Sequence, residues 1–499
     1  MRKILPLLAL LLAASATAQP ACNALSAQNI AALYENLPIE LEQPALPQIP
    51  DASVSIEQFG AVGDGVTMCT AAFDKAIKAL PDGGHVIVPK GVWLTGPIRL
   101  RSKIDLHVEK GAIVIFTQEK SAYLPDKGLE KRMLPCIRAE KCTDVSITGG
   151  GIIDGNGKYW RYAKRTKLSD QEWEDLQKLG GTETDGGKLW FPYDLKNVRN
   201  ITDGPESEEA LRQHMVSIKR CQRVLISGVT IQNAPRFHLV PSQCTDLIIS
   251  GVTVRCPWNA QNGDGIDICN SQRALVTGCT VDVGDDGICM KGGSGESGVK
   301  AGPCSDFLIT GNTVLHAHGG FVMGSDISGG MRRMVVKDCC FSGTDTGLRF
   351  KSAPGRGGHT EEIYIYDITM NDIREAAITF SCDYADITYK TPEQVKGLAY
   401  APDFTGMKIS NIVCRECTTG IYAHGIAGLD CVHGITVANS TFFYTGTATD
   451  IDETPPRSLS TVSVSSHSSG YSALQVQPPP GARRTFTLPS AGTVIVTFL

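Results

Sequence analysis

One phrase of alternating apolar and polar residues recurs along the middle of the chain. It starts at Lys141 as KCTDVSITGGGI and returns at uneven intervals as RCQRVLISGVTI, QCTDLIISGVTV, NSQRALVTGCTV and PCSDFLITGNTV. A constant strand separated by loops of variable length is typical of a parallel β-helix, in which loops emerge from each coil. Short glycine-punctuated strands elsewhere, such as HVIVPKGVWLTG, agree with an all-β fold. The pattern therefore predicts a β-solenoid with loop insertions.

A second pattern lies further along each repeat and reads glycine (once alanine), apolar, any residue, apolar. Its copies begin at Gly265, Gly287, Gly320, Gly347, Ala377 and Gly420. Alternation along a strand buries the two apolar residues and points the residue between them outward. Stacked strands lie about 4.8 Å apart. The outward residues of successive copies are therefore expected to form a stripe on one face.

Composition and pattern also divide the chain. We predict a signal peptide at residues 1–18, a lead-in at 19–50, a β-helix at 51–444 with an insertion at about 155–214, and a Ser/Pro-rich tail at 445–499. Short helices are expected at Ala71–Leu80 and, within the inserted lobe, at EWEDLQKL. The long chain is thus interpreted as one solenoid with additions rather than several domains.

The first residues, MRKILPLLALLLAASATAQ, combine a basic start, an apolar run and Ala16-Thr17-Ala18. This layout predicts export, to the periplasm or beyond the cell, with cleavage after Ala18. The apolar run is short for a membrane span, and no other stretch is long and apolar enough to provide one.

The charge and cysteine content narrow the functional classes. The net charge of −5 provides no basic field for nucleic acid, so no such partner is expected, and no oligomeric state is implied. The 17 cysteines are an odd number, so at least one is unpaired without an intermolecular disulfide. Cys142, Cys221, Cys244 and Cys304 share one position of the first repeat and are expected to pack in a column rather than form disulfides.

Charged residues gather on the predicted stripe. Successive coils carry His238, then Asp264 and Asp267, then Asp285 and Asp286, then His318, then Arg349 and Lys351, and further on Tyr422. An aspartate beside a glycine is ordinary turn chemistry. Several stacked acids, however, repel one another unless a task or a metal compensates, and such repulsion raises one pKa as a general acid requires.

Paired carboxylates around a sugar linkage are the usual device of glycoside hydrolysis. Asp285 and Asp286 are neighbours and would point to opposite faces of a regular strand. Both can face a substrate only if the backbone is irregular there, which Gly284 and Gly287 would permit. The sequence therefore predicts a local kink.

The cations suggest the kind of sugar. Arg349 and Lys351 lie two apart and share a face, and arginine binds carboxylates bidentately, so an anionic sugar is indicated. The alternative is a salt bridge between these cations and the nearby acids. His318 lies among small residues in HAHGGF and is interpreted as a site residue rather than a packed histidine.

Four ordered motifs resemble the polygalacturonase family of glycoside hydrolases, family 28. They stand here as Asn262-Gly263-Asp264, Asp285-Asp286, Ala317-His318-Gly319 and Arg349-Phe350-Lys351. With FGAVGDGVT at Phe59, the resemblance runs from about Phe59 to Phe443. It implies a single-stranded right-handed parallel β-helix and inverting hydrolysis of α-1,4-galacturonosyl linkages in pectic polysaccharide, with no metal and no cofactor.

The same resemblance implies residue roles. Asp285 would be the general acid, Asp264 and Asp286 would activate water, and His318 would support the acid. Substrate binding would involve Arg349, Lys351 and Tyr422, with Asn262 from the first motif and His238 from the preceding coil as further candidates.

Departures from the family pattern also carry information. Ala317 replaces the first glycine of Gly-His-Gly, and GGSGESGVKAGP is inserted between Asp285 and His318. This insertion and the lobe at about 155–214 resemble those of bacterial exo-acting members, so an exo-hydrolase is expected.

Three other functions stay open from the sequence. The first is a hydrolase of rhamnogalacturonan or substituted galacturonan, whose members tend to lose the His and Arg-x-Lys motifs present here. The second is a calcium-dependent pectate lyase, with the acids as calcium ligands. The third is a non-catalytic solenoid that binds polysaccharide or protein.

Overall fold

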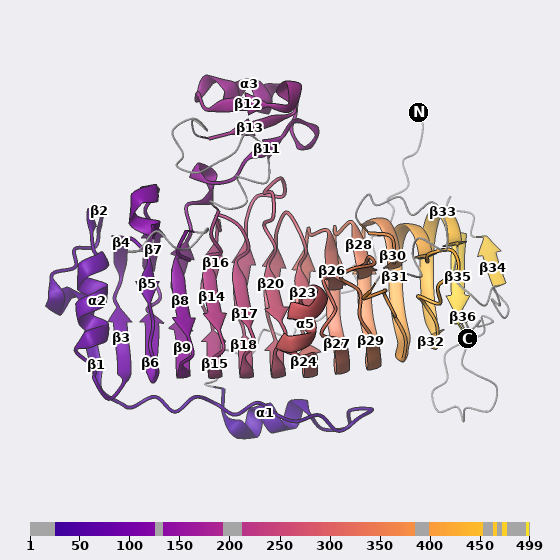
Figure 1. Ribbon diagram of the computed structural model, residues 1–499, viewed down its shortest axis with the longest axis horizontal. Coiled ribbons are helices and arrows are strands. Elements are labelled where there is room, and N and C mark those ends of the chain that lie inside the picture. Colours follow the sequence, from indigo (N-terminus) through magenta and orange to yellow (C-terminus); the bar gives the residue numbers. More distant parts are fainter. Residues whose placement is uncertain are drawn as a thin grey trace, which may run out of the picture.

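The chain folds as a right-handed parallel β-helix, which confirms the predicted fold class (Figure 1). The computed structural model describes residues 25–124, 133–192, 212–384 and 399–452, and the backbone of three strands beyond them. The predicted signal peptide at 1–18 lies outside the described residues. Among those residues, no helix is long and apolar enough to cross a membrane.

Each coil contributes strands to three parallel sheets, and neighbouring coils pair in register. The first sheet holds β5 (Ile98–Arg99), β8 (Ile137–Glu140), β14 (Val216–Lys219), β17 (Leu239–Ser242), β20 (Ile266–Cys269), β23 (Ile288–Lys291), β26 (Gly319–Ser325), β28 (Thr346–Ser352) and β30 (Ile373–Ser381). The second holds β1 (Ser53–Ser55), β3 (Gly84–Val88), β6 (Ile104–Val108), β9 (Thr143–Gly149), β15 (Gln222–Ser227), β18 (Thr245–Ser250), β21 (Gln272–Thr277) and β24 (Cys304–Thr310). The third holds β2 (Asp64–Met68), β4 (Gly91–Thr95), β7 (Ala112–Phe116), β10 (Ile152–Asp154), β16 (Thr230–Gln232), β19 (Thr253–Arg255), β22 (Thr280–Asp282) and β25 (Thr313–Leu315).

Toward the C-terminal end, single long strands bend from one sheet into the next. These are β27 (Met331–Ser342), β29 (Thr360–Asn371), β31 (Met407–His424) and β33 (Ser440–Asp452), with β32 (Ile435–Ala438) beside β31. Strand β33 continues past the predicted solenoid boundary at residue 444, because it pairs with β31 as far as Asp452. That boundary is therefore too early as an end of the last coil.

The predicted stripe is confirmed by the register of the first sheet. Ile266, Ile288, Phe321, Leu348, Ile378 and Ile421 are paired in succession, as expected from their shared place after the glycine or alanine. All six are buried. Burial of such an apolar column stabilises each coil on its neighbours, at about 25 cal/mol per Å² of apolar surface. The residue between the apolar pair consequently faces the outside of the first sheet.

The cysteine column is also confirmed as packing. Cys142, Cys221, Cys244 and Cys304 are buried, and every cysteine in the described part of the chain is free. The backbone N–H of Cys142 points to the sulfur of Cys221 at 3.4 Å, so the thiols satisfy turns between coils.

A strap, defined as residues 25–50, runs along one edge of the solenoid and includes α1 (Ala27–Leu33) (Figure 1). Its Ile30 and Leu41 pack on a separate apolar cluster of the second sheet formed by Ile248, Leu275, Leu308 and Val335. The strap therefore covers outward apolar residues that would otherwise be exposed.

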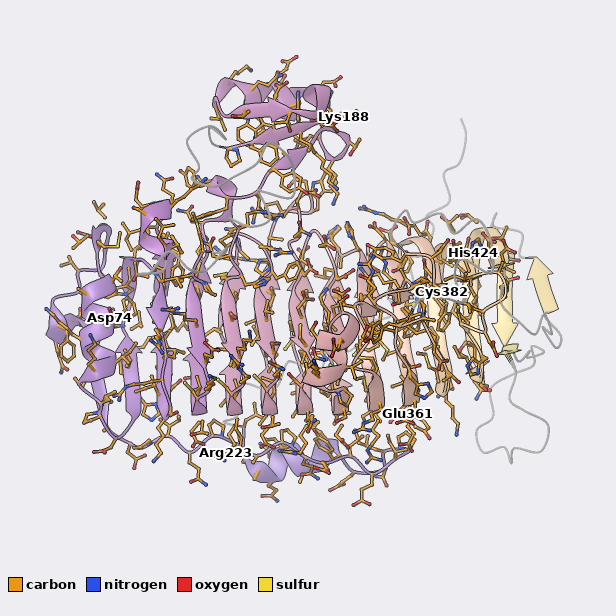
Figure 2. All side chains as sticks on the ribbon, viewed as in Figure 1. Asp74, Lys188, Arg223, Glu361, Cys382 and His424 are labelled. Carbon is orange, nitrogen blue, oxygen red and sulfur yellow. The ribbon has the colours of Figure 1, made fainter. Side chains whose placement is uncertain are left out.

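Beside the strap, acids and arginines alternate from coil to coil in what we call the charge ladder: Asp144, Arg223, Asp246, Arg273, Asp306 and Arg333. Figure 2 shows Arg223 at the edge that faces the strap. The three aspartates also accept backbone N–H groups of the strap, from Gln48, Ala45 and Glu42 respectively. The ladder thus joins coils to one another and to the strap.

The remaining elements close the ends and one side. Helix α2 (Thr70–Lys78), predicted at 71–80, packs Phe73 and Ile77 against the first coils. The inserted lobe carries α3 (Asp170–Lys178) and a small sheet of β11 (Ala163–Lys164), β12 (Thr182–Thr184) and β13 (Leu189–Phe191), standing above the solenoid in Figure 1. Helix α5 (Gly295–Ala301) occupies the predicted insertion after β23. At the far end, β34 (Ser463–Ser466), β35 (Ser472–Val476) and β36 (Val496–Phe498) add antiparallel pairs to the last coil.

Candidate active site

The turn between β22 and β23 carries Asp285 and Asp286, and it is not a regular strand. The backbone N–H of Asp286 donates to the Asp285 carboxylate over 3.0 Å. At Gly284 an added Cβ would lie 2.7 Å from the carbonyl oxygens of Ala260 and Trp258, so only glycine fits there. The predicted irregularity is confirmed, and it lets two sequence neighbours serve one site.

Asp286 is buried between two cations. Its Oδ1 lies 3.1 Å from Arg349 and its Oδ2 lies 2.7 Å from Lys351 Nζ. Burial by itself raises the pKa of Asp286, but Lys351, Arg349 and Lys291 outweigh it and hold that pKa well below its usual range. The alternative of a salt bridge between the cations and the acids is therefore realised, in the same place as the expected site.

Asp285 pairs with the histidine of the next coil. The backbone N–H of His318 donates to the Asp285 carbonyl over 2.9 Å, and His318 Nδ1 lies 3.0 Å from Asp285 Oδ1. Burial raises the pKa of Asp285, but the hydrogen bond from His318 and the charge of Lys351 leave it below its ordinary value. His318, which the sequence placed on the coil after Asp285, thus lies directly beside it.

Asp264 and Asp267 form a buried cluster with Lys291. The two aspartates were expected from the sequence, but Lys291 was not. Lys291 Nζ lies 3.5 Å from Asp264 and 3.4 Å from Asp267. Within the described residues, Asp264 Oδ1 and both carboxylate oxygens of Asp267 have no hydrogen-bond partner. Burial and the neighbouring acids raise the pKa of Asp264 well above its usual range, and burial raises that of Asp267 to about 6.

His238 corrects an expectation, because the structure does not offer it to a substrate. It is fully buried; its Nε2 accepts the Ala234 N–H over 3.2 Å and its Nδ1 lies 2.8 Å from the Asp264 carbonyl. Burial lowers the pKa of His238 to about 4. Its ring therefore holds the backbone carbonyl of Asp264 from inside the solenoid.

Asn262 has a left-handed backbone with φ of 50°, and its amide oxygen accepts from Arg212 over 2.6 Å. The buried Arg212 also donates to the Gln261 carbonyl over 2.9 Å. This contact orders the turn that ends in Asp264, so Asn262 is held in a position beside the acids.

Two tyrosines lie on the C-terminal side of the acids. Tyr422 pairs with Thr379, which pairs with Arg349, so it stands in the predicted column two coils further on, stacked on His424 at 4.0 Å. Tyr384 was not selected from the sequence, yet Lys351 Nζ lies 4.9 Å and Arg349 5.7 Å from its ring centre. The pair of cations is therefore bounded by an aromatic face.

The lobe also reaches the site through Lys167. Its Nζ lies 3.2 Å from His318 Nε2 and 3.4 Å from the Gly284 carbonyl. Burial lowers the pKa of Lys167, while the charge of Asp285 opposes that change.

Three side chains of the site could supply metal ligands. One possible ligand atom from each of Asp285, Asp286 and His318 lies within 4.8 Å of the others. Both Asp286 oxygens already face cations, and Asp285 Oδ1 faces His318. Calcium favours six to eight oxygen ligands. An imidazole and two adjacent cations do not suit it, so the donor set does not favour the lyase alternative.

The segment that carries these acids, the histidine and the cations matches a known protein family. The model of glycosyl hydrolases family 28 matches residues 199–451. The chain belongs to glycosyl hydrolase family 28. The matched segment contains all four motifs recognised in the sequence.

Individual relatives refine the comparison. The chain is 29% identical over 413 residues to an exo-poly-alpha-D-galacturonosidase of Dickeya chrysanthemi, covering 77% of this chain and 65% of that protein. It is 28% identical to a probable polygalacturonase of Vitis vinifera, covering 65% of this chain and 62% of that protein. The chain thus spans less than two thirds of the length of both relatives.

Among solved structures, the chain is similar to a hyperthermoactive exopolygalacturonase from Thermotoga maritima. The TM-score is 0.63 and the identity 27%, over 82% of this chain and 94% of that one.

The site residues that were not predicted from the sequence differ in whether the sequence contains a signal for them. Lys291 follows Cys289 by two positions as Lys351 follows Arg349, which was a usable signal, whereas nothing local to Lys167 or Tyr384 marks them.

Proposed function

We propose that this family 28 chain hydrolyses α-1,4-galacturonosyl linkages of polygalacturonate from a chain end. The observation that carries the proposal is the Arg349–Lys351 pair beside the acids, because a buried pair of cations suits a uronate carboxylate. The relatives named as an exo-galacturonosidase and an exopolygalacturonase support the same substrate class.

In the proposed mechanism, Asp285 donates a proton to the glycosidic oxygen while Asp264 and Asp286 activate water. His318 stabilises the Asp285 carboxylate that remains, through its 3.0 Å contact. A substrate carboxylate would compete with Asp286 for Arg349 and Lys351, with Tyr384 and Tyr422 bounding the sugar. When the substrate carboxylate draws Arg349 and Lys351 away from the acids, the pKa values of those acids rise. This change favours a protonated Asp285 once substrate is bound.

The exo assignment rests on the additions to the solenoid. The lobe contacts the site through Lys167, and α5 (Gly295–Ala301) follows the strand that begins after Asp286. Additions of this kind at one end of a groove favour attack at a chain terminus, because they shorten the space for a continuing polymer.

The deciding experiment is an analysis of products from polygalacturonate with a chelator present, following reducing ends and ultraviolet absorbance together. Saturated monomer or dimer from the earliest time is expected. A ladder of saturated oligomers would refute exo action, and absorbing unsaturated products that appear only with calcium would refute hydrolysis. Faster release of reducing ends from rhamnogalacturonan than from polygalacturonate would reassign the substrate.

A variant tests the role of the proposed general acid. Asp285→Asn should reduce kcat by about 10²–10⁴-fold, the usual contribution of a general acid.

Stereochemistry needs its own measurement. One oxygen of Asp285 lies within 4.8 Å of one oxygen of Asp286, and inverting enzymes hold their carboxyl groups about 6.5–9.5 Å apart. In the proposed mechanism Asp264, on the preceding coil, shares in positioning the water. Proton NMR of the first anomer released is expected to show inversion.

We also propose that the chain is exported, from the signal-like residues 1–18. Mature protein that begins at Gln19 would support this, and an intact Met1 on the active protein would oppose it. We further propose that residues 19–50 form a lead-in and that the β-helix begins near residue 51 and extends to Asp452, with the tail after it.

A further inference from the structure

A lysine of the inserted lobe that the family motifs do not include reaches the catalytic face of the solenoid. Lys167 ends the short 3-10 helix Arg165–Lys167, next to β11 of the lobe. Its Nζ lies 3.2 Å from His318 Nε2 and 3.4 Å from the carbonyl of Gly284, in the turn that carries Asp285. One ammonium group therefore joins the lobe both to the histidine and to the acid-bearing turn.

The contacts define where the imidazole proton lies. An ammonium group has donors only, so His318 Nε2 must accept from Lys167. The remaining ring nitrogen, Nδ1, then carries the proton and donates to Asp285 Oδ1 over 3.0 Å. The chain of groups Lys167, His318 and Asp285 consequently has one direction of donation.

Other charged groups near His318 act on the same ring. Asp345 Oδ2 lies 3.9 Å from Nε2 and would favour a second proton there, but Arg374 lies 3.5 Å from the other Asp345 oxygen and offsets its charge. His316 lines the same hollow and pairs with Asp282 at 3.2 Å rather than with His318. Among these groups, Lys167 is the one within hydrogen-bond distance of Nε2.

We propose that Lys167 is a positioning residue that holds His318 as a neutral imidazole, protonated on Nδ1 and directed at Asp285. This inference rests on the proposed function, since it concerns the support of the general acid. It gives the lobe a role in the chemistry in addition to shaping the groove, because the lobe completes the surroundings of the catalytic turn.

The test compares full-length Lys167→Met and Lys167→Arg on polygalacturonate. Lys167→Met is expected to lower kcat about 10-fold, part of the 10²–10⁴-fold that positioned proton transfer supplies, with KM changed less than about threefold. The acid limb of the kcat–pH profile should move to higher pH, because no cation then opposes a second proton on the ring. Lys167→Arg should restore most of kcat. Lys188→Met, at an exposed lysine of the same lobe (Figure 2), is the matched control and should behave as wild type.

A double-mutant cycle separates positioning from lobe attachment. In a His318→Gln background, Lys167→Met should change kcat less than about twofold, because its effect passes through His318. An equal loss in both backgrounds, or an unmoved acid limb, would overturn the proposal.

A readout independent of activity uses ¹⁵N-histidine-labelled protein, with the His318 resonance assigned by His318→Gln. His318 should stay neutral and Nδ1-protonated to lower pH in the wild type than in Lys167→Met. Identical titrations would refute the role of Lys167. An inactive wild type with different titrations would instead refute the proposed function and keep the positioning role.

Discussion

The acids of the site differ in their surroundings although they lie on adjacent coils. Asp286 faces two cations and its pKa is lowered, whereas Asp264 is buried beside other acids and its pKa is raised. Environments that separate the pKa values of neighbouring carboxyls are typical of acid–base catalysis. In the free protein the proton is thus favoured on Asp264. In the proposed mechanism the negative charge of the bound substrate must raise the pKa of Asp285 before that residue can donate a proton.

Lys291 offers a direct test at this scale. Its charge lowers the pKa values of both Asp264 and Asp267, so Lys291→Met should raise them. A base that must be ionised would then be protonated up to higher pH. The acid limb of the kcat/KM profile on polygalacturonate should therefore move to higher pH, and the rate at mildly acidic pH should fall about 10²-fold.

Lys300→Met is the control for that experiment, because Lys300 is exposed on α5 and pairs with Glu296. An unmoved acid limb in Lys291→Met, with the fold intact by circular dichroism, would show that Lys291 does not govern the acids.

At the scale of elements, the strap and the charge ladder depend on one another. Asp144, Asp246 and Asp306 each bind an arginine of the next coil and a backbone N–H of the strap. A buried carboxylate left without these partners would cost stability, since hydrogen bonds to charged groups contribute about 1.5–3 kcal/mol each. The ladder therefore converts outward polar positions of the second sheet into a binding edge for residues 25–50.

Asp246→Asn tests this edge while keeping a residue type that tolerates the left-handed backbone at this position, where φ is 58°. Loss of the charge should lower the free energy of unfolding by about 1 kcal/mol and speed proteolysis within the strap. Burial raises the pKa of Asp246, but Arg273 and the strap N–H lower it overall. A lowered folded-state pKa means that this stabilisation is present above the unfolded value of about 3.9 and is lost as pH falls below it.

The wild type should therefore lose stability at its strap progressively as the pH falls from about 4 through the lower folded-state pKa of Asp246, and Asp246→Asn should show a weaker dependence. Asp367→Asn is the matched control, an exposed aspartate with φ of 57° that bonds to Asn411. Equal protease sensitivity of the two variants would contradict the role of the ladder.

The whole molecule is a solenoid, and a solenoid has two ends to protect. Helix α2 covers the first coils, and β35 and β36 pair antiparallel with β33 and β32 at the other end. Unpaired edge strands are templates for association with other chains. The tail strands therefore act as a cover over the last coil.

A chain that ends at Asp452 should expose β32 and β33 and self-associate as its concentration rises, measured by light scattering after size exclusion. A chain ending at Val476 keeps β35 and should associate less. A truncated protein with the wild-type mass at all concentrations would show that the edge needs no cover.

The sequence by itself determined the repeat, and with it the register of the coils, the stripe and the motifs. This was possible because a parallel β-helix stacks equivalent residues directly, so that column positions such as Ile266 and Ile288 can be read from spacing alone. The local kink at Asp285 and Asp286 was equally readable, because glycines on both sides permit one backbone shape. The same logic would have found Lys291.

Only the tertiary structure decided the contacts between segments far apart in the chain. Lys167 contacts His318 from a lobe that lies outside the repeat pattern. Tyr384 lies over cations of an earlier coil. The strap binds coils that follow it in the chain by up to 293 residues. His238 occupies an expected column, yet its ring is fully buried, because one ring nitrogen accepts from the Ala234 N–H of its own coil and the other lies against the Asp264 carbonyl. Such outcomes depend on which buried polar groups need partners, and that is settled when the coils pack.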